Sequence, residues 1–148
     1  MHILFIGYGK TSQRVAKHLF EQAHHISTIS RSQKTDCYAT HYLQDIQQLD
    51  LAQLRPVDVV YVILAPSQSG IAAYQQTYVD SIEPIVEALK GHPVQRIIIV
   101  SSTRVYGENA GERIDDESMI QPIDEQGHLL RKMELLWQAY YPQQSIIV

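Results

Sequence analysis

The stretch "FIGYGKTSQRVAKHL" (Phe5–Leu19) places two glycines between an apolar run and an amphipathic pattern. The run that leads into it, His2–Ile6, is strand-length and mostly apolar, whereas apolar residues after Thr11 recur every three to four positions, as on one helix face. Gly7 and Gly9 therefore stand in a strand-to-helix turn. A first glycine permits a tight turn, and a second lets the backbone approach a pyrophosphate at the helix N-terminus. The stretch predicts either a nucleotide loop or a turn that uses glycine for its geometry alone.

The third glycine of the pattern G-x-G-x-x-G is missing, and Ser12 stands in its place. That glycine mainly lets the helix pack close to the strand, and serine is small enough to be tolerated there. Lys10 brings a positive charge that serves either a phosphate or a solvated surface. The candidate cofactor-binding residues of this loop are Gly7, Tyr8, Gly9, Lys10, Thr11 and Ser12.

Strand-like and helix-like segments alternate along the rest of the chain. The strand-like runs are rich in Ile and Val and mostly apolar throughout, which is typical of parallel strands covered on both faces. This alternation predicts one α/β domain over residues 1–148, a three-layer doubly wound parallel sheet (Rossmann fold) of about six strands. The expected strands are His2–Ile6, His25–Ile29, Asp58–Leu64, Arg96–Ser101 and Ser145–Val148, with a weaker one near Cys37–Leu43. The first expected helix begins at Thr11, and the others cover Ile46–Leu54, Ile71–Leu89 and His128–Tyr140. Pro84 should kink or break the helix over Ile71–Leu89 around Asp80–Glu83.

In such a sheet the carboxyl ends of the strands meet at one edge, where ligands bind. The second strand ends without the Asp or Glu that would hold a free ribose 2′-hydroxyl. Arg31 and Ser32 stand there, followed by Lys34, and the planar fork of arginine suits a 2′-phosphate. The sequence thus favours NADP over NAD, unless this is only an exposed polar turn. Further cofactor-binding candidates at the edge are Asp45, Leu64, Ala65 and Ser101.

The stretch Ser101–Gly107 reads SSTRVYG, and Asp116-Glu117 and Pro122 follow it. This pattern resembles the "SSxxVYG" and "DE…P" segments of the extended short-chain dehydrogenase/reductase superfamily, the NAD(P)-dependent epimerase/dehydratase group. The resemblance covers the whole chain in order. It implies a small-molecule substrate such as a nucleotide sugar, a catalytic hydroxyl at Ser102 that orients the substrate oxygen, and a homodimer through the helices at 71–90 and 127–141.

The family's Tyr-x-x-x-Lys pair, in which tyrosine is the general acid and base, is absent from this chain. Aligned through Glu134, the two positions hold Gln126 and Leu130, which exchange no proton at neutral pH. The smaller C-terminal substrate region of relatives is expected to be absent after Val148. Three readings follow: an NADP-preferring oxidoreductase- or epimerase-like protein, a non-catalytic NADP(H)-binding or sensing module, or a truncated fragment without activity of its own.

The composition of the chain limits the classes of binding partner that we expect. The chain has 148 residues, a net charge of −4 and a pI near 5.9, which give no reason to expect nucleic acid or an anionic membrane. The histidines show no metal-ligand spacing, so no metal site is expected. The single cysteine, Cys37, is expected to be a small buried residue in a reducing compartment. The sequence therefore predicts a cytoplasmic protein.

Overall fold

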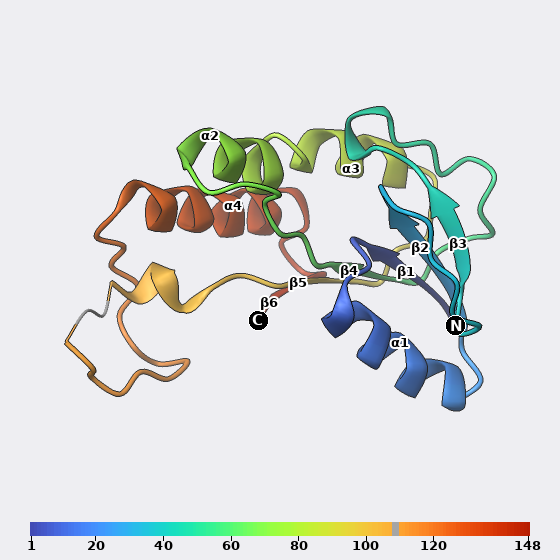
Figure 1. Ribbon diagram of the computed structural model, residues 1–148, viewed down its shortest axis with the longest axis horizontal. Coiled ribbons are helices and arrows are strands. Elements are labelled where there is room, and N and C mark those ends of the chain that lie inside the picture. The colour runs from blue at the N-terminus through green and yellow to red at the C-terminus, as the bar shows by residue number, and fades with distance from the viewer. Residues whose placement is uncertain (108–109) are drawn as a thin grey trace.

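The computed structural model describes residues 1–107 and 110–148, and its centre is one parallel sheet (Figure 1). The strand order is β3-β2-β1-β4-β5-β6, and every neighbouring pair is parallel. This confirms the predicted six-stranded doubly wound α/β sheet. The strands are β1 (His2–Ile6), β2 (His25–Ser30), β3 (Thr40–Leu43), β4 (Val59–Val62), β5 (Arg96–Ile99) and β6 (Ser145–Ile147).

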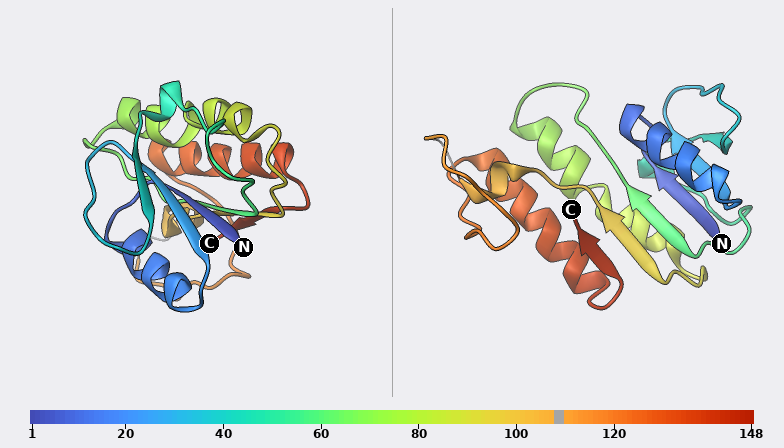
Figure 2. Two further views of the ribbon diagram at one scale, coloured as in Figure 1. Left: turned by 90° about the vertical axis from the view of Figure 1, so that its right-hand side faces the viewer. Right: turned by 90° about the horizontal axis from the view of Figure 1, so that it is seen from below.

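The α-helices lie on opposite faces of this sheet (Figures 1 and 2). From β1 to β2 the chain advances toward the β3 edge of the sheet, and after β4 it advances toward the β6 edge. Because parallel crossovers are right-handed, α1 falls on one face and α2 to α4 on the other. The helical elements are α1 (Lys10–Glu21), α2 (Ile71–Tyr74), α3 (Ile82–Leu89) and α4 (Glu125–Tyr140), with a π-helical segment η2 (Gln75–Val79) and short 3₁₀ turns η1 (Ile46–Gln48) and η3 (Thr103–Tyr106).

The core has two layers because alternate residues of each strand face opposite sides. In β1, Leu4 and Ile6 pack toward α3 and α4, where Trp137 is also fully buried. Ile3 and Phe5 face the other way, toward α1. Every residue of β1 is buried, which explains why its sequence does not alternate between polar and apolar residues.

The break in the helical pattern after Ile71 lies where it was predicted, although Pro84 does not itself sit at the break. The π-helical segment ends at Val79, the side chain of Gln75 donates to Asp80 at 2.7 Å, and α3 begins at Ile82. Pro84 occupies the first turn of α3, where a missing N–H removes no intrahelical hydrogen bond.

Two local expectations are wrong. The helix expected at Ile46–Leu54 is only the short turn η1, because the side chain of Gln44 donates to the Asp50 carbonyl at 2.9 Å and accepts from the Asp50 amide at 2.8 Å. These contacts occupy backbone groups that a helix would use. Cys37 is exposed rather than buried, on the irregular stretch between β2 and β3.

Among residues 1–107 and 110–148, no helix combines the length and the apolar character needed to cross a lipid bilayer.

Candidate functional site

The glycine loop turns tightly between β1 and α1, and its first glycine is required by geometry. Gly7 has a φ of +88°, a backbone conformation that residues with a Cβ rarely adopt. A Cβ there would lie 2.1 Å from the carbonyl oxygen of Ile63, at the end of β4. Gly7 therefore lets two neighbouring strand ends close together beneath the loop.

Gly9 serves a different purpose, because it is the N-cap of α1 and a Cβ there would meet nothing within 4 Å. No side chain caps the helix at this position. The first-turn N–H groups of a helix have no intrahelical partner and carry partial positive charge. The open space at Gly9 thus fits a pyrophosphate, which would accept hydrogen bonds from this end of α1.

Ser12 does more than replace a glycine. Its side chain is fully buried, and its hydroxyl donates to the carbonyl oxygen of Gly7 at 2.9 Å. This bond joins the first turn of α1 to the loop that precedes it. The expectation that Ser12 lets the helix pack against the strand agrees with this placement.

The loop opens into a hollow of about 690 Å³ between α1, β2 and the end of β4. The structure brings ten of the predicted site residues together around it: Gly7, Tyr8, Gly9, Lys10, Thr11, Ser12, Arg31, Ser32, Leu64 and Ala65. Other residues that line it were not among the predicted cofactor-binding residues, and the ends of β2, β3 and β4 were the available signal. Ile29 and Ser30 end β2, whereas Gln44, Ile46, Ile63 and Ser67 follow β3 or β4.

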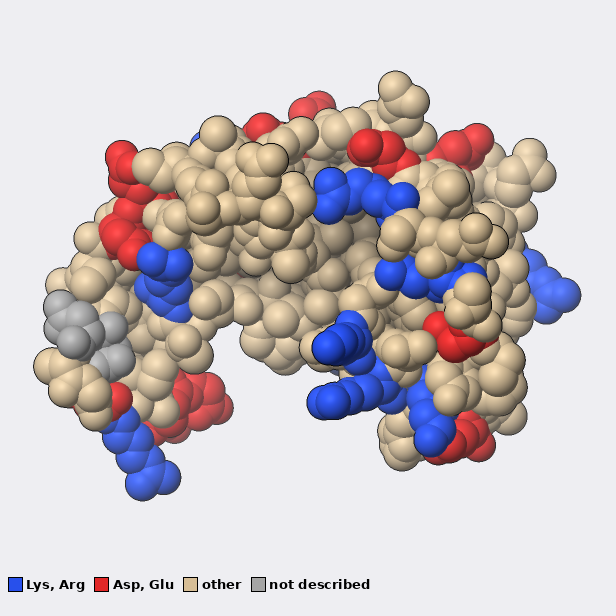
Figure 3. Space-filling model, in the orientation of Figure 1, with Lys and Arg blue, Asp and Glu red and all other residues tan. Residues whose placement is uncertain are grey.

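This hollow is positively charged. Lys10, Arg31 and Lys34 line it, and none of the described residues around it is an Asp or a Glu. Figure 3 shows blue side chains gathered around the recess beside the start of α1. A lining with three cations and without carboxylates suits a ligand that carries several phosphate charges.

Asp45 lies in a smaller neighbouring hollow of about 110 Å³ rather than among the residues around the glycine loop. The two hollows share Arg31, Leu64 and Ala65, so they adjoin. The Asp45 carboxylate accepts from the amide of Gln47 at 2.9 Å and caps η1. Its side chain therefore also has a structural task.

Ser101 and Ser102 line a separate hollow of about 460 Å³ beyond the end of β5. The structure does not bring them among the residues that surround the glycine loop, because β4 separates β1 from β5. Ser102 is exposed, and its hydroxyl oxygen accepts from the amide of Arg104 at 3.3 Å. Ser101 instead donates to the Glu134 carboxylate at 2.6 Å.

Glu134 is a buried acidic side chain that sequence reasoning used only as an alignment marker. It is 3% exposed, and its second carboxylate oxygen lies 3.0 Å from a guanidinium nitrogen of Arg131. The carboxylate thus joins α4 to the end of β5 through Ser101. This contact holds the segment that carries Ser102 against the helix.

We expect Glu134→Ala to lower the free energy of unfolding by about 2 kcal/mol, because the Ser101 hydroxyl loses its acceptor and a buried space opens. Thermal unfolding monitored by circular dichroism measures this change. The control is Glu83→Ala, since Glu83 is an exposed residue of α3 and should change stability by less than roughly 0.5 kcal/mol. Equal melting temperatures for the two variants would contradict a structural role for Glu134.

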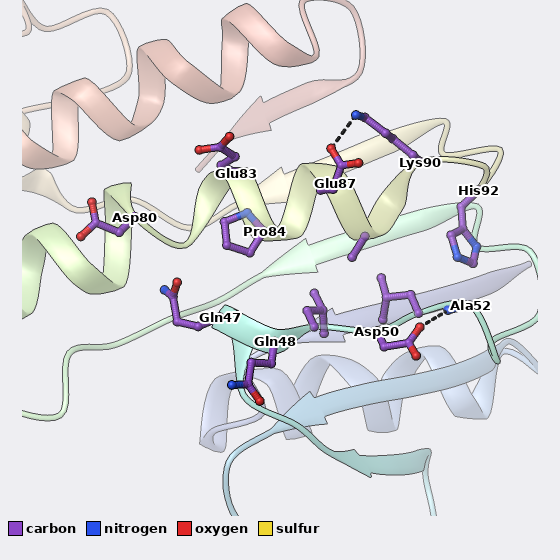
Figure 4. Close-up of a pocket in the computed structure, with 13 residues that line it drawn as sticks. Gln47, Gln48, Asp50, Ala52, Asp80, Glu83, Pro84, Glu87, Lys90 and His92 are labelled. Atoms are coloured by element: carbon purple, nitrogen blue, oxygen red, sulfur yellow. Dashed lines mark hydrogen bonds and ion pairs between the residues drawn. The ribbon is translucent and has the colours of Figure 1, made fainter.

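A further hollow of about 790 Å³ lies between α3 and the segment Gln47–Ala52 (Figure 4). Asp50, Asp80, Glu83 and Glu87 line it, whereas Lys90 is its one Lys or Arg among the described residues. Lys90 is an ion-pair partner of Glu87. Because these carboxylates would repel phosphates, this hollow does not suit a dinucleotide. It contains none of the predicted site residues.

Comparisons with known proteins show the family and the fold of the chain. The model of the NAD dependent epimerase/dehydratase family matches residues 7–141. The curated protein YeeZ of Escherichia coli (strain K12) is 28% identical over 85 residues, which is 57% of this chain and 30% of YeeZ.

Solved structures show the same fold. UDP-glucuronic acid 4-epimerase from Bacillus cereus in complex with NAD superposes with a TM-score of 0.81 at 22% identity, over 99% of this chain and 55% of that one. A UDP-galactose 4-epimerase gives a TM-score of 0.83 at 17% identity, over 99% and 55%. The chain thus spans about half the length of these solved structures. With the family model matched over nearly all of its length, the chain belongs to the NAD-dependent epimerase/dehydratase family.

Proposed function

We propose that residues 1–148 form the dinucleotide-binding domain of an epimerase/dehydratase-type protein that prefers NADP(H), with NAD(H) as the alternative cofactor. The observation that carries the proposal is the hollow at the glycine loop. Three cations line it, none of the described residues around it is an Asp or a Glu, and the space beside Gly9 is open. Gly7 to Ser12 would hold the pyrophosphate. Arg31, Ser32 and Lys34 would hold the 2′-phosphate. Asp45, in the adjoining hollow, would face the adenine end.

The substrate is proposed to be a small molecule, such as a nucleotide sugar. Solved relatives of the same fold include a UDP-glucuronic acid 4-epimerase with UDP-glucuronic acid and NAD bound. A bound nicotinamide would supply the hydride acceptor or donor. The exposed hydroxyl of Ser102 would orient a substrate oxygen, as the family resemblance implies. We place the protein in the cytoplasm, where the exposed thiol of Cys37 would stay reduced.

A second candidate function is a non-catalytic module that binds NADP(H) without turnover. It is favoured by the residues at the family's acid–base positions. Gln126 lies in the first turn of α4, and Leu130 is 1% exposed and belongs to the hydrophobic core. A side chain packed in this way contributes to stability, and it carries no charge that could lower a neighbouring pKa.

Titration of the protein with NADPH and NADH, followed by nicotinamide fluorescence, tests the proposal. We expect saturable binding of both, with NADPH the tighter. Absence of binding at millimolar concentrations would refute both candidate functions, and tighter binding of NADH would refute the NADP preference. Formation of a new sugar product from a nucleotide sugar, with NADP+ as the bound cofactor for epimerase or dehydratase chemistry and NADPH for reduction, would then separate the enzyme from the non-catalytic module.

The proposed homodimer pairs α2 and α3 of one protomer with α4 of its partner in a shared helical layer. Apolar side chains remain exposed on these helices: Ile71 is 47% exposed, Leu135 50% and Tyr140 48%. An interface that buries such side chains on association would remove apolar surface from water. We expect Leu135→Glu to shift sedimentation from dimer to monomer, whereas Leu43→Glu, at a 67% exposed residue of β3, should leave the dimer intact. A monomeric wild-type protein would contradict the proposal.

A further inference from the structure

The proposed 2′-phosphate residues stand on a stretch with little regular structure of its own. Arg31 and Ser32 follow β2 directly, and both are exposed. The chain from Arg31 to Ala39 forms no helix or strand before β3 begins at Thr40. Such a stretch needs contacts from elsewhere to fix where its cations point. The side chain of Asp36 supplies them.

The Asp36 carboxylate is 10% exposed and joins the stretch to the glycine loop and to α1. The Tyr8 hydroxyl donates to one of its oxygens at 3.2 Å, and the Gln13 side-chain amide donates to the other at 3.2 Å. The amide of Tyr38 donates to the first oxygen at 3.1 Å. One carboxylate thus connects the residue between the two glycines, the first half of α1 and the stretch that carries Arg31.

His41 holds the same stretch from the sheet side. Its Nε2 lies 3.1 Å from the carbonyl oxygen of Asp36 and 3.4 Å from an oxygen of the Asp36 carboxylate. Its Nδ1 lies 2.7 Å from the hydroxyl of Thr28 in β2. In a neutral imidazole, an Nε2–H that donates to Asp36 leaves Nδ1 as the acceptor from Thr28. Both ring nitrogens are therefore used, and the imidazole links the stretch to β2.

Tyr8 is suited to be a permanent donor in this arrangement. It is 5% exposed, and its ring lies edge-on to Phe5 and 5.2 Å from the His41 ring, measured between centroids. Burial, together with the negative charge of Asp36, raises the pKa of Tyr8. The phenol therefore stays protonated at neutral pH and keeps its hydrogen bond to Asp36.

We infer that Tyr8, Asp36 and His41 act as positioning residues that hold the Arg31–Lys34 stretch against the glycine loop, and so set the discrimination between 2′-phosphorylated and 2′-hydroxyl dinucleotides. The inference rests on the proposed function. Tyr8, Arg31, Ser32 and Lys34 line the same hollow. A ligand that bridges them binds more tightly when their separation is fixed beforehand, because less ordering is needed on binding.

The test uses Tyr8→Phe, which removes one hydroxyl and keeps the buried ring. Dissociation constants for NADPH, NADH and adenosine 2′,5′-bisphosphate are measured alongside amide hydrogen exchange of residues 31–39 in the free protein. We expect roughly three- to tenfold weaker binding of the two 2′-phosphorylated ligands, a much smaller change for NADH, and faster exchange in the stretch. Asp36→Ala should enlarge each effect.

The control is Tyr61→Phe, because Tyr61 stacks on Phe5 in the same layer, at 4.8 Å between ring centroids, but does not line the hollow. It should leave exchange and selectivity unchanged. Unchanged exchange in Tyr8→Phe, or equal losses for NADPH and NADH, would overturn the inference while the proposed function stands. A wild-type protein without preference for NADPH would overturn both.

Discussion

Gly7→Ala is expected to lower the free energy of unfolding by roughly 2–6 kcal/mol, a large part of the total for a domain of this size. Two costs add together. A residue with a Cβ at a φ of +88° costs about 1–3 kcal/mol in backbone strain. The methyl group would also lie 2.1 Å from the Ile63 carbonyl oxygen, so the ends of β1 and β4 must separate. Forced overpacking of this kind typically costs about 1–3 kcal/mol more. Chemical denaturation followed by circular dichroism measures the sum.

Two other glycines separate these costs. Gly91 has nearly the same φ, +87°, but a Cβ there meets nothing within 4 Å, so Gly91→Ala isolates the backbone strain. Gly9→Ala meets neither obstacle, because its φ is −94° and its surroundings are open. This variant should fold normally yet bind dinucleotides roughly tenfold more weakly, since its methyl group occupies the space proposed for the pyrophosphate. A Gly7→Ala protein as stable as Gly91→Ala would contradict the assigned clash.

The central strand of the sheet was predictable because it is buried on both faces. Ile3 to Ile6 point to both core layers, so their apolar run is continuous. In β4 and β5 the residues that face the larger core layer are buried and their neighbours are half-buried or exposed, yet Ile and Val still fill most positions. The glycine loop was predictable for a related reason. Only glycine satisfies the geometry at Gly7. The requirement is therefore visible in the sequence as a glycine at a fixed position after the strand.

Tertiary side-chain contacts between distant segments were not predictable in this way. In the sequence, Asp36 is one of several polar residues between two strands. Its partners Tyr8 and Gln13 are 28 and 23 positions away, so no local pattern links them. The missing helix after Asp45 has a similar origin, because one glutamine side chain, Gln44, takes both backbone groups of Asp50. Local propensity favours a helix over Ile46–Leu54, and the contact overrides it. Spacing and periodicity do not record which polar side chain meets which backbone group.

Arg31→Ala is the variant with the largest expected effect on cofactor selectivity. A hydrogen-bonded charge pair with a phosphate contributes about 1–3 kcal/mol, so NADPH should bind roughly 5- to 150-fold more weakly. NADH offers no 2′-phosphate, and its affinity should hardly change. Arg31 is exposed, so the substitution should leave the melting temperature nearly unaltered. Titration of both dinucleotides by isothermal calorimetry measures the selectivity directly.

Matched variants decide whether charge or shape carries this selectivity. Arg31→Lys keeps the charge but loses the planar fork, so intermediate NADPH binding is expected if two guanidinium nitrogens contact the phosphate. Arg14→Ala removes an exposed arginine of α1 that does not line the hollow, and it should affect neither dinucleotide. Because the phosphate contact is solvent-accessible, added salt should weaken NADPH binding more in the wild type than in Arg31→Ala. Equal losses of affinity for NADPH and NADH in Arg31→Ala would mean that this arginine contacts a part of the cofactor that both dinucleotides share, such as the adenine ring. Lys34 would then be the remaining cation of the stretch able to select the 2′-phosphate.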